Sequence, residues 1–401
     1  MTTKKAAPAP QAAPAKTNGI SLQKKELSLI LSILAPFIPS RVGLISARVA
    51  NGMLEFFATV GFYDGSALVR VPCRNEPFGW KHVNGPAFSG VISSASDGDI
   101  SLEFGENALT VKYPKTTNDL KYFEPQKWME MKFPAPGASL SGDDFNAIAM
   151  MTEAASDDET RPNLNGVYFA VTKGELETAA SDGFILSFKS VRSNIEDVRG
   201  AIYSARALFN AKRAIKAGDA ETLGFGFASK GTDVIPGIVL SAQRDHGIEA
   251  MIHIPRMEGN FPDYKQITSA APDARKCVRV ELPTPTMETM LKRAKALEGN
   301  LFFQVLGGRF WFMSVNEVTG QKSIDSVPVD GVQKDSVVMC YASSKFRDAL
   351  KACAANGKVS LTFPEANNKP MLLEGKASGI AMPLVNPLKE SPFKNLQPTL
   401  I

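Results

Sequence analysis

One pattern occurs three times along this chain and limits its fold more than any other feature. A glycine opens a strand-like run at Gly52, at Gly174 and, less regularly, at Gly308. The separations are 174 − 52 = 122 and 308 − 174 = 134 residues, which is the length of an ordinary domain. An internal repeat of this length predicts three similar units within the 401 residues.

Two amphipathic helices accompany each of these glycines. Ahead of them, apolar residues recur at helical spacing over residues 22–34, after Ser141 and from Thr286. Ser141 with Asp144 three residues later is a capping-box signal for a helix start. A second helix is expected about thirty residues after each glycine, over residues 86–96, 203–217 and 343–355. Strand-like runs follow at 100–104, 109–113, 223–227, 238–241, 359–363 and 371–373. The repeated unit is therefore predicted to be α+β.

Proline-bearing breaks near Pro136 and near Pro272 suggest where the units meet. We expect units over residues 19–135, 136–271 and 272–388, followed by an extension over 389–401. Residues 1–18 are mostly Ala, Pro, Lys, Thr and Gln, which predicts a disordered, weakly basic tail.

Composition excludes several classes of protein. The chain is 44% hydrophobic and 21% charged, which is typical of a globular protein with a proper core. It has no apolar run long enough to predict a membrane span. The four cysteines lie far apart without Cys-x-x-Cys spacing, so we expect buried free thiols in a reducing compartment.

The expected helices differ in charge from the rest of the chain. By count they sum to +7, whereas the whole chain is +4, so the remainder is −3. A basic helix face is often only a solvated face. Three of six helices skewed the same way instead favour a surface that contacts phosphates without reading base sequence. The basic residues are Arg206, Lys212, Arg213 and Lys216, then Lys292, Arg293 and Lys295, then Lys345, Arg347 and Lys351.

No catalytic, metal-binding or phosphate-binding motif stands out in the sequence. The three histidines lack metal-ligand spacing, and neither Lys358 nor Lys376 belongs to a phosphate-binding loop. The acidic pairs at 97–99, 143–144 and 157–158 are better explained as turns or helix caps than as a two-metal site. We therefore expect no catalytic residue, no metal and no cofactor.

A family resemblance rests on three stretches. Residues 161–167 read Arg-Pro-Asn-Leu-Asn-Gly-Val, and an Ala-Ser-Asp-Gly turn follows at 180–183, with alternating hairpin strands around Lys173 and Gly174. The others are Glu-Gly-Asn-Phe-Pro-Asp-Tyr at 258–264 and Gly-Ile-Ala-Met-Pro-Leu at 379–384. Together they resemble the bacterial DNA sliding clamp, the beta subunit of DNA polymerase III, over roughly residues 20–388.

The resemblance implies a fold and a function. The fold would be three clamp domains with helices lining a pore and antiparallel sheets outside. Two chains would join head to tail into a ring around double-stranded DNA, and the ring would tether a DNA polymerase and be opened by an ATP-dependent clamp loader. Such a protein works in the cytoplasm, at the nucleoid or in a bacterium infected by phage. One alternative is a clamp-like scaffold or transcription tether that does not close into a ring, and its mass in solution would distinguish it from a ring. The other alternative, which is less favoured, is an enzyme on the same framework.

The resemblance also implies a hydrophobic pocket for short peptides between the second and third domains. The alternative is that its residues are ordinary core at a domain junction. Phe184 and Ile185 replace a usual His-Arg pair, Gln266 replaces a basic residue and Val385 an arginine, so we expect partners with a more apolar motif. The implied pocket residues are Ser181, Gly183, Ile185, Leu186, Pro262, Gln266, Ile267, Ile380, Met382, Pro383 and Leu384.

DNA-facing residues follow partly from the resemblance and partly from helix charge. Arg41 matches a family arginine near the pore, whereas Asp158 replaces a polar contact that is then lost. Lys24 and Lys25 are expected to join the ten basic helix residues named above.

Overall fold

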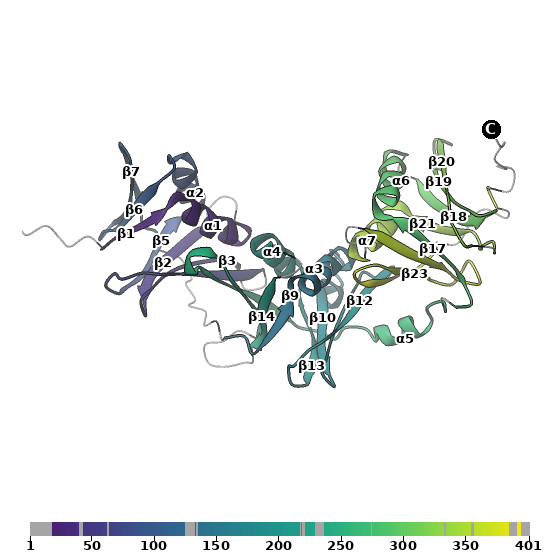
Figure 1. The fold of residues 1–401 in the computed structure, drawn as a ribbon, viewed down its shortest axis with the longest axis horizontal. Coiled ribbons are helices and arrows are strands. Elements are labelled where there is room, and N and C mark those ends of the chain that lie inside the picture. The colour runs from purple at the N-terminus through teal and green to yellow at the C-terminus, as the bar shows by residue number, and fades with distance from the viewer. Residues whose placement is uncertain are drawn as a thin grey trace, which may run out of the picture. The chain divides into compact units, whose positions relative to one another are not determined.

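The computed structural model, drawn in Figure 1, describes most of the chain. The chain forms two compact units. Unit 1 comprises residues 1–58, 68–128 and 244–248, and unit 2 comprises residues 59–67, 129–243 and 249–401. The described residues are 18–39, 43–61, 64–124, 133, 135–216, 218, 221–228, 236–273, 275–297, 299–332, 334–353, 357–384 and 391–393.

The first eight strands and the first two α-helices belong mainly to unit 1. They are β1 (Asn18–Gln23), α1 (Lys24–Leu34), the 3-10 turn η1 (Ala35–Phe37), β2 (Leu44–Ala50), β3 (Met53–Gly61), β4 (Gly65–Pro72), β5 (Phe78–Asn84), α2 (Gly85–Ser94), β6 (Asp99–Phe104), β7 (Ala108–Tyr113) and β8 (Thr116–Lys121). A further 3-10 turn, η4 (Asp245–Gly247), also belongs to this unit.

Unit 2 contains the remaining elements. Its first half holds β9 (Ala138–Ser141), α3 (Gly142–Met150), η2 (Met151–Ala154), η3 (Pro162–Leu164), β10 (Gly166–Thr172), β11 (Glu175–Ser181), β12 (Ile185–Arg192), β13 (Val198–Ser204), α4 (Ala205–Ile215), β14 (Thr222–Ala228), β15 (Gly237–Gln243) and β16 (Glu249–Met257). Its second half holds α5 (Tyr264–Ser269), β17 (Val278–Pro283), α6 (Thr284–Leu297), β18 (Asn300–Leu306), β19 (Arg309–Val315), β20 (Lys322–Pro328), β21 (Met339–Ala342), α7 (Ser343–Cys353), β22 (Lys358–Phe363), β23 (Met371–Glu374) and β24 (Ser378–Ala381).

The predicted triplication is confirmed by strand order. In each repeat of eight strands, the first strand pairs with the sixth, the sixth with the seventh and the seventh with the eighth. Likewise the fifth strand pairs with the second, the second with the third and the third with the fourth. The orders are β1-β6-β7-β8 with β5-β2-β3-β4, then β9-β14-β15-β16 with β13-β10-β11-β12, then β17-β22-β23-β24 with β21-β18-β19-β20. The fold is thus α+β with antiparallel sheets, as predicted.

The three repeated glycines lie in equivalent tight turns between the second and third strands of each repeat. Both residues of every turn have positive φ, which is the two-residue hairpin geometry that glycine and asparagine adopt most easily. The φ values are 53° and 72° at Asn51 and Gly52, 53° and 76° at Lys173 and Gly174, and 59° and 72° at Gly307 and Gly308.

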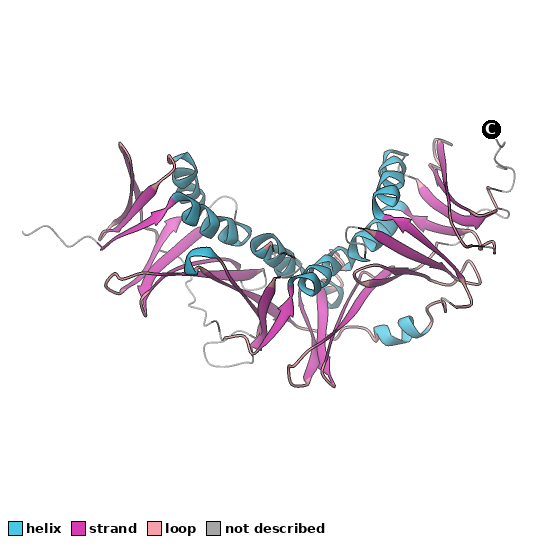
Figure 2. Cartoon of the chain, in the orientation of Figure 1, coloured by secondary structure: helices cyan, strands magenta, loops and turns pink. Residues whose placement is uncertain are grey.

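In each repeat, one pair of helices lies on one side of that repeat's sheets (Figure 2). In unit 1, α1 packs against α2; in unit 2, α3 packs against α4 and α7, and α7 packs against α6. The helix α1 buries Leu27, Ile30 and Leu34 at the predicted spacing. The helix layer of unit 2 therefore forms one continuous surface.

Several predicted helix starts were displaced by strands. Residues 22–23 belong to β1, and Tyr203 belongs to β13, where it pairs with Val167, so α1 and α4 begin later than expected. Ser204 then accepts a hydrogen bond from the Ala207 amide and caps α4. Ser141 caps α3 in the same way, as the capping-box pattern predicted.

Among the described residues, no helix is long and apolar enough to cross a membrane. Nor does this part of the chain bring three His, Cys, Asp or Glu side chains together as a metal site. All four cysteines are free, with Cys340 and Cys353 buried as expected but Cys73 and Cys277 only half-buried.

Candidate peptide pocket and nucleic-acid interface

The second and third repeats of the chain both lie in unit 2, and a strand pair joins them. The strand β12 runs antiparallel to β24, with Leu186 opposite Ile380 and Ile185 opposite Ala381. Successive residues of a strand point to opposite faces of the sheet. Leu186 and Ile380 therefore share one face, and Ile185 lies on the other with Ala381.

A rigid turn leads into β12. The Ser181 hydroxyl donates to the Ile185 carbonyl (2.7 Å) and accepts from the Gly183 amide (3.1 Å). The Asp182 carboxylate accepts from the amides of Phe184 (2.8 Å) and Ile185 (2.9 Å). Gly183 has a φ of +93°, a conformation that other residues rarely adopt. Ser181 and Gly183 thus shape the turn and leave Phe184 half exposed.

An apolar cluster forms beside this junction. Its buried members are Ala179, Leu186 and Ile380. Partly buried side chains from more distant segments pack on it, namely Tyr168, Phe188, Phe261, Tyr264, Ala271 and Leu372. The centroid of the Tyr168 ring lies 5.5 Å from that of Phe261 and 5.9 Å from that of Tyr264.

The sequence analysis missed these aromatic residues. The register of the predicted hairpin carried a signal, since Tyr168 and Phe188 both lie opposite Ala179 on neighbouring strands. The segment 261–264 is fixed through Glu177, which accepts from Lys265 (2.8 Å) and Tyr264 (3.3 Å). Burial and nearby carboxylates raise the pKa of Tyr264.

Exposed apolar side chains lie on the segments that contribute to this cluster. Six large hydrophobic side chains are exposed in the described part of the chain, and Phe184, Ile267 and Met382 are three of them. The Met382 amide donates to the Phe184 carbonyl (2.9 Å), and the Leu384 amide donates to the Cys340 carbonyl (2.8 Å). Segment 382–384 therefore continues from β24 as an extended edge.

The structure brings together most of the residues proposed for the pocket, but in different roles. Leu186 and Ile380 lie in the cluster, and Met382, Pro383 and Leu384 extend from it. Pro262 follows the clustered Phe261, while Gln266 and Ile267 are exposed on the short helix α5. Ile185 is buried on the opposite sheet face, and Val385 lies outside the described residues.

A second candidate surface lies on the helix layer of unit 2. Side chains from α3, α4, α6 and α7 line a hollow of about 690 Å³. Its acidic lining residues are Glu153 and Glu288, against six basic ones. The basic residues are Lys212, Lys292, Lys295, Arg347, Lys351 and Lys376. The hollow thus has a surplus of basic over acidic side chains.

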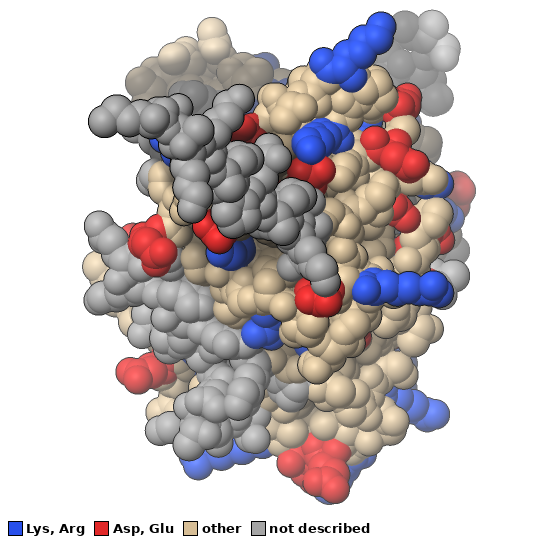
Figure 3. Space-filling model, turned by 90° about the vertical axis from the view of Figure 1, so that its left-hand side faces the viewer, with Lys and Arg blue, Asp and Glu red and all other residues tan. Residues whose placement is uncertain are grey.

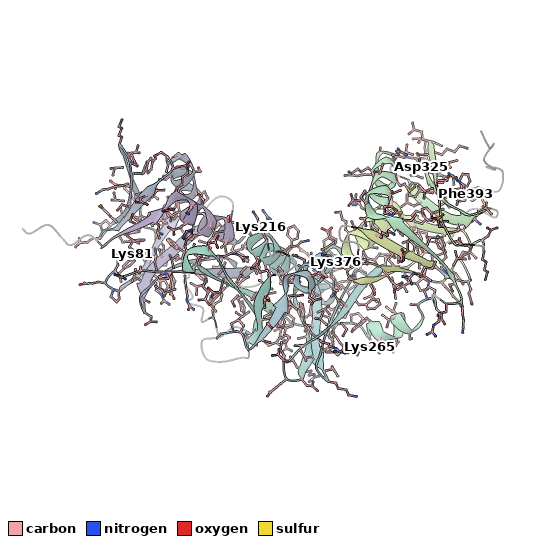
Figure 4. The ribbon with its side chains drawn as sticks, viewed as in Figure 1. Lys81, Lys216, Lys265, Asp325, Lys376 and Phe393 are labelled. Carbon is pink, nitrogen blue, oxygen red and sulfur yellow. The ribbon has the colours of Figure 1, made fainter. Side chains whose placement is uncertain are left out.

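Lys376 was missed by the sequence analysis. It lies in the turn between β23 and β24 rather than on a helix, so helix periodicity carried no signal for it (Figure 4). Its ammonium lies 2.5 Å from the Asp143 carboxylate of α3.

Several predicted DNA-facing residues form ion pairs with carboxylates of the same chain. Arg293 reaches both carboxylate oxygens of Asp325 (2.6 and 2.7 Å). The other pairs are Lys351 with Glu153 (3.1 Å), Arg347 with Asp348 (3.4 Å), Lys345 with Asp182 (2.5 Å), Arg206 with Asp64 (3.6 Å) and Lys24 with Asp97 (3.5 Å). Arg206 and Lys345 line a separate hollow that also holds six carboxylates.

Other predicted cations have no ion pair within the described residues. Lys292 and Lys295 on α6 are of this kind, as are Lys25 and Lys216. Burial lowers the pKa of Lys212, and Glu153 partly opposes that shift. The Arg213 guanidinium lies 6.0 Å from the Phe209 ring centroid.

The predictions for Arg41 and Asp158 stay predictions. Arg41 lies outside the described residues. Asp158 is held in its own turn by Thr160 and Arg161. On the face that Figure 3 shows, basic and acidic side chains are interspersed and neither sign forms one continuous patch.

Comparison with known proteins agrees with this architecture. Residues 140–245 match the family model of the DNA polymerase III beta subunit, central domain. No curated protein matches the sequence.

Solved structures match over nearly the whole chain. The DNA polymerase III subunit beta from Pseudomonas aeruginosa is 16% identical with a TM-score of 0.72, and the match covers 92% of this chain and 100% of that one. A putative beta subunit from Eubacterium rectale gives 14% identity, a TM-score of 0.73 and the same coverage. The Helicobacter pylori beta clamp bound to a DNA ligase peptide gives 20%, a TM-score of 0.68 and again the same coverage. The chain therefore has the fold of the bacterial DNA sliding clamp over most of its length, and its residues 140–245 match the model of that family's central domain.

Proposed function

We propose that this protein is a DNA polymerase processivity factor, a sliding clamp that closes around duplex DNA as a head-to-tail homodimer. The observation that carries the proposal is the strand pair between repeats. The eighth strand of the third repeat, β24, pairs with the fourth strand of the second, β12. Among the described strands, the corresponding ones without such a neighbour are β8, the eighth of the first repeat, and β20, the fourth of the third.

These two strands are suited to pair between chains. In the described part of the chain, β8 pairs with β7 alone and β20 with β19 alone. An edge strand with free backbone groups is a template for another strand. If β8 of one chain pairs with β20 of a second, two such contacts close a dimer of six repeats.

The basic hollow supports DNA as the enclosed ligand. Lys292 and Lys295 lack carboxylate partners within the described residues and are available to phosphates. Contacts of this kind are independent of base sequence and weaken with salt. The chain would hold DNA without chemistry of its own, so we propose no enzymatic activity and no cofactor.

The exposed apolar side chains beside β24 support a peptide pocket for a polymerase, an ATP-dependent clamp loader and repair proteins. The H. pylori clamp with the same fold was solved with a DNA ligase peptide. We place the three clamp domains at residues 19–135, 136–271 and 272–388, between the N-terminal tail and the C-terminal extension. The protein would act on the nucleoid or in the cytoplasm of an infected bacterium.

Solution mass tests the dimer directly. One chain is 43.2 kDa, so the ring requires 2 × 43.2 = 86.4 kDa by light scattering. The Val329 amide donates to Gly308, so by alternation the Ser326 amide points away from β19. We expect Ser326→Pro to remove an outward donor and yield monomer, whereas Ser326→Ala, which keeps the amide, remains dimeric.

Retention on DNA tests the ring. The dimer should stay on nicked circular DNA once loaded and slide off after linearisation. The proposal would be contradicted if the wild-type protein were a monomer at micromolar concentration and also failed to remain on circular DNA. That result would favour a scaffold that does not close into a ring.

A further inference from the structure

The C-terminal extension contributes a buried aromatic residue to the last sheet. Phe393 is 1% exposed and lies in a cluster with Phe302, Trp311, Met313 and Cys340. The centroids of its ring and of the Trp311 ring are 6.0 Å apart. Figure 4 shows Phe393 on the side of this sheet away from α6.

This sheet is apolar on both faces. Phe303 packs on Phe346 of α7, with ring centroids 4.6 Å apart, so its face belongs to the core under the helices. Phe302 precedes Phe303 in β18 and therefore points to the opposite face. A sheet covered by helices on one side ordinarily has a polar second face. Here the second face is apolar, and Phe393 of the C-terminal extension packs on it.

A polar contact fixes residues 391–393 in one register on the sheet. The Ser391 hydroxyl donates to the side-chain oxygen of Gln304, and the Phe393 amide donates to the Ser391 hydroxyl (3.2 Å). Gln304 is 7% exposed, and its amide nitrogen is held by the Ser336 carbonyl (3.0 Å). The site thus accepts an aromatic side chain together with a hydroxyl donor two residues before it.

The Phe393 site is continuous with the candidate peptide pocket. Leu384 packs on the Trp311 cluster, whereas Ile380 belongs to the cluster around Leu186. Four residues of extended chain span about 13 Å. The half-exposed Met382 lies between the two clusters. Together they form a surface that suits an extended peptide of about five residues.

We propose that the Trp311 cluster is the far end of the peptide pocket and that the chain's own Ser391-Pro392-Phe393 segment occupies it in competition with partner peptides. This inference rests on the proposed clamp function, because it assigns regulation to that pocket. A segment tethered only seven residues after Leu384 has an effective concentration in the millimolar range, so it should weaken partner binding by about tenfold.

The test uses the full chain and three measurements. Phe393→Asp removes the anchor, and Val318→Asp is the matched control, because Val318 is fully exposed at a turn of the same sheet. Alkylation of Cys340, which is buried in the cluster, reports whether the tail has left. A fluorescein-labelled peptide of residues 388–396 reports occupancy of the site, and the H. pylori DNA ligase peptide serves as competitor.

In Phe393→Asp we expect Cys340 to react faster by about tenfold and the labelled peptide to bind about tenfold tighter than to wild type or the control. The ligase peptide should displace the labelled peptide. Unchanged Cys340 reactivity would overturn the proposal, as would a labelled peptide that the bound ligase peptide fails to displace. If the ligase peptide binds none of the proteins, competition is overturned, whereas the dimer mass and DNA retention still test the clamp function separately.

Discussion

The ammonium of Lys345 lies 2.5 Å from a carboxylate oxygen of Asp182, a residue 163 positions earlier in the chain. Lys345 belongs to the helix α7, whereas Asp182 forms the turn before β12 and is almost fully buried. The other oxygen of Asp182 holds the amides of Phe184 and Ile185. One ion pair thus connects the helix layer to the turn beside the peptide pocket.

Asp182→Ala should destabilise unit 2 because it removes the ion pair and both amide acceptors at a buried site. We expect the free energy of unfolding to fall by about 2 kcal/mol. Asp182→Asn keeps an acceptor for the two amides and should cost about 1 kcal/mol. Urea unfolding measures both. The control is Asp97→Ala, since Asp97 is fully exposed beside Lys24 and its loss should leave stability nearly unchanged. Equal effects at positions 97 and 182 would contradict this account.

The repeat and its hairpins could be predicted from the sequence because their signals are local. Positive φ at Gly52, Gly174 and Gly308 follows from turn chemistry that neighbouring residues determine. Helix starts were less predictable. Tyr203 suits either a helix or a strand, and pairing with Val167 of β10 decided the outcome.

The candidate site could be predicted only in part because its contacts join distant segments. The resemblance supplied Leu186 and Ile380, but the packing of Tyr168 on Phe261 depends on tertiary structure. Helix charge likewise predicted a basic surface without showing which cations carboxylates already hold. The docking of Phe393 on Trp311 had no local signal at all.

Two adjacent residues of α6 test which basic side chains contact DNA. Lys292 lines the basic hollow without an ion pair in the described chain, whereas Arg293 is held by both oxygens of Asp325. We expect Lys292→Gln to weaken DNA binding and to reduce the slope of log affinity against log salt by about 0.9. Arg293→Gln should leave the slope nearly unchanged. Titration of labelled duplex DNA at several salt concentrations measures both, and a larger loss for Arg293→Gln would reverse the assignment.

The buried thiols should be protected from alkylation. Burial raises the pKa of Cys340 and of Cys353 to about 12. A raised pKa leaves little thiolate at pH 8, and only the thiolate reacts. Iodoacetamide at pH 8 should therefore label Cys73 in the native protein, and Cys340 and Cys353 only after unfolding. Peptide mass spectrometry assigns each site. Rapid native labelling of Cys353, which lies against Ser187, would contradict its burial.

Comparison among the three hairpin turns identifies a stabilising substitution. The first turn has Asn51 where the third has Gly307, and both residues adopt positive φ. A side-chain Cβ at Gly307 would meet no atom within 4 Å. Asparagine tolerates this conformation and restricts the unfolded chain more than glycine does, so Gly307→Asn should raise the free energy of unfolding by about 0.5 kcal/mol. Gly308→Ala serves as the opposite control, since alanine is strained at a φ of +72° and should cost about 1 kcal/mol. Urea unfolding of both variants measures the difference, and a destabilising Gly307→Asn would show that the third turn is not equivalent to the first.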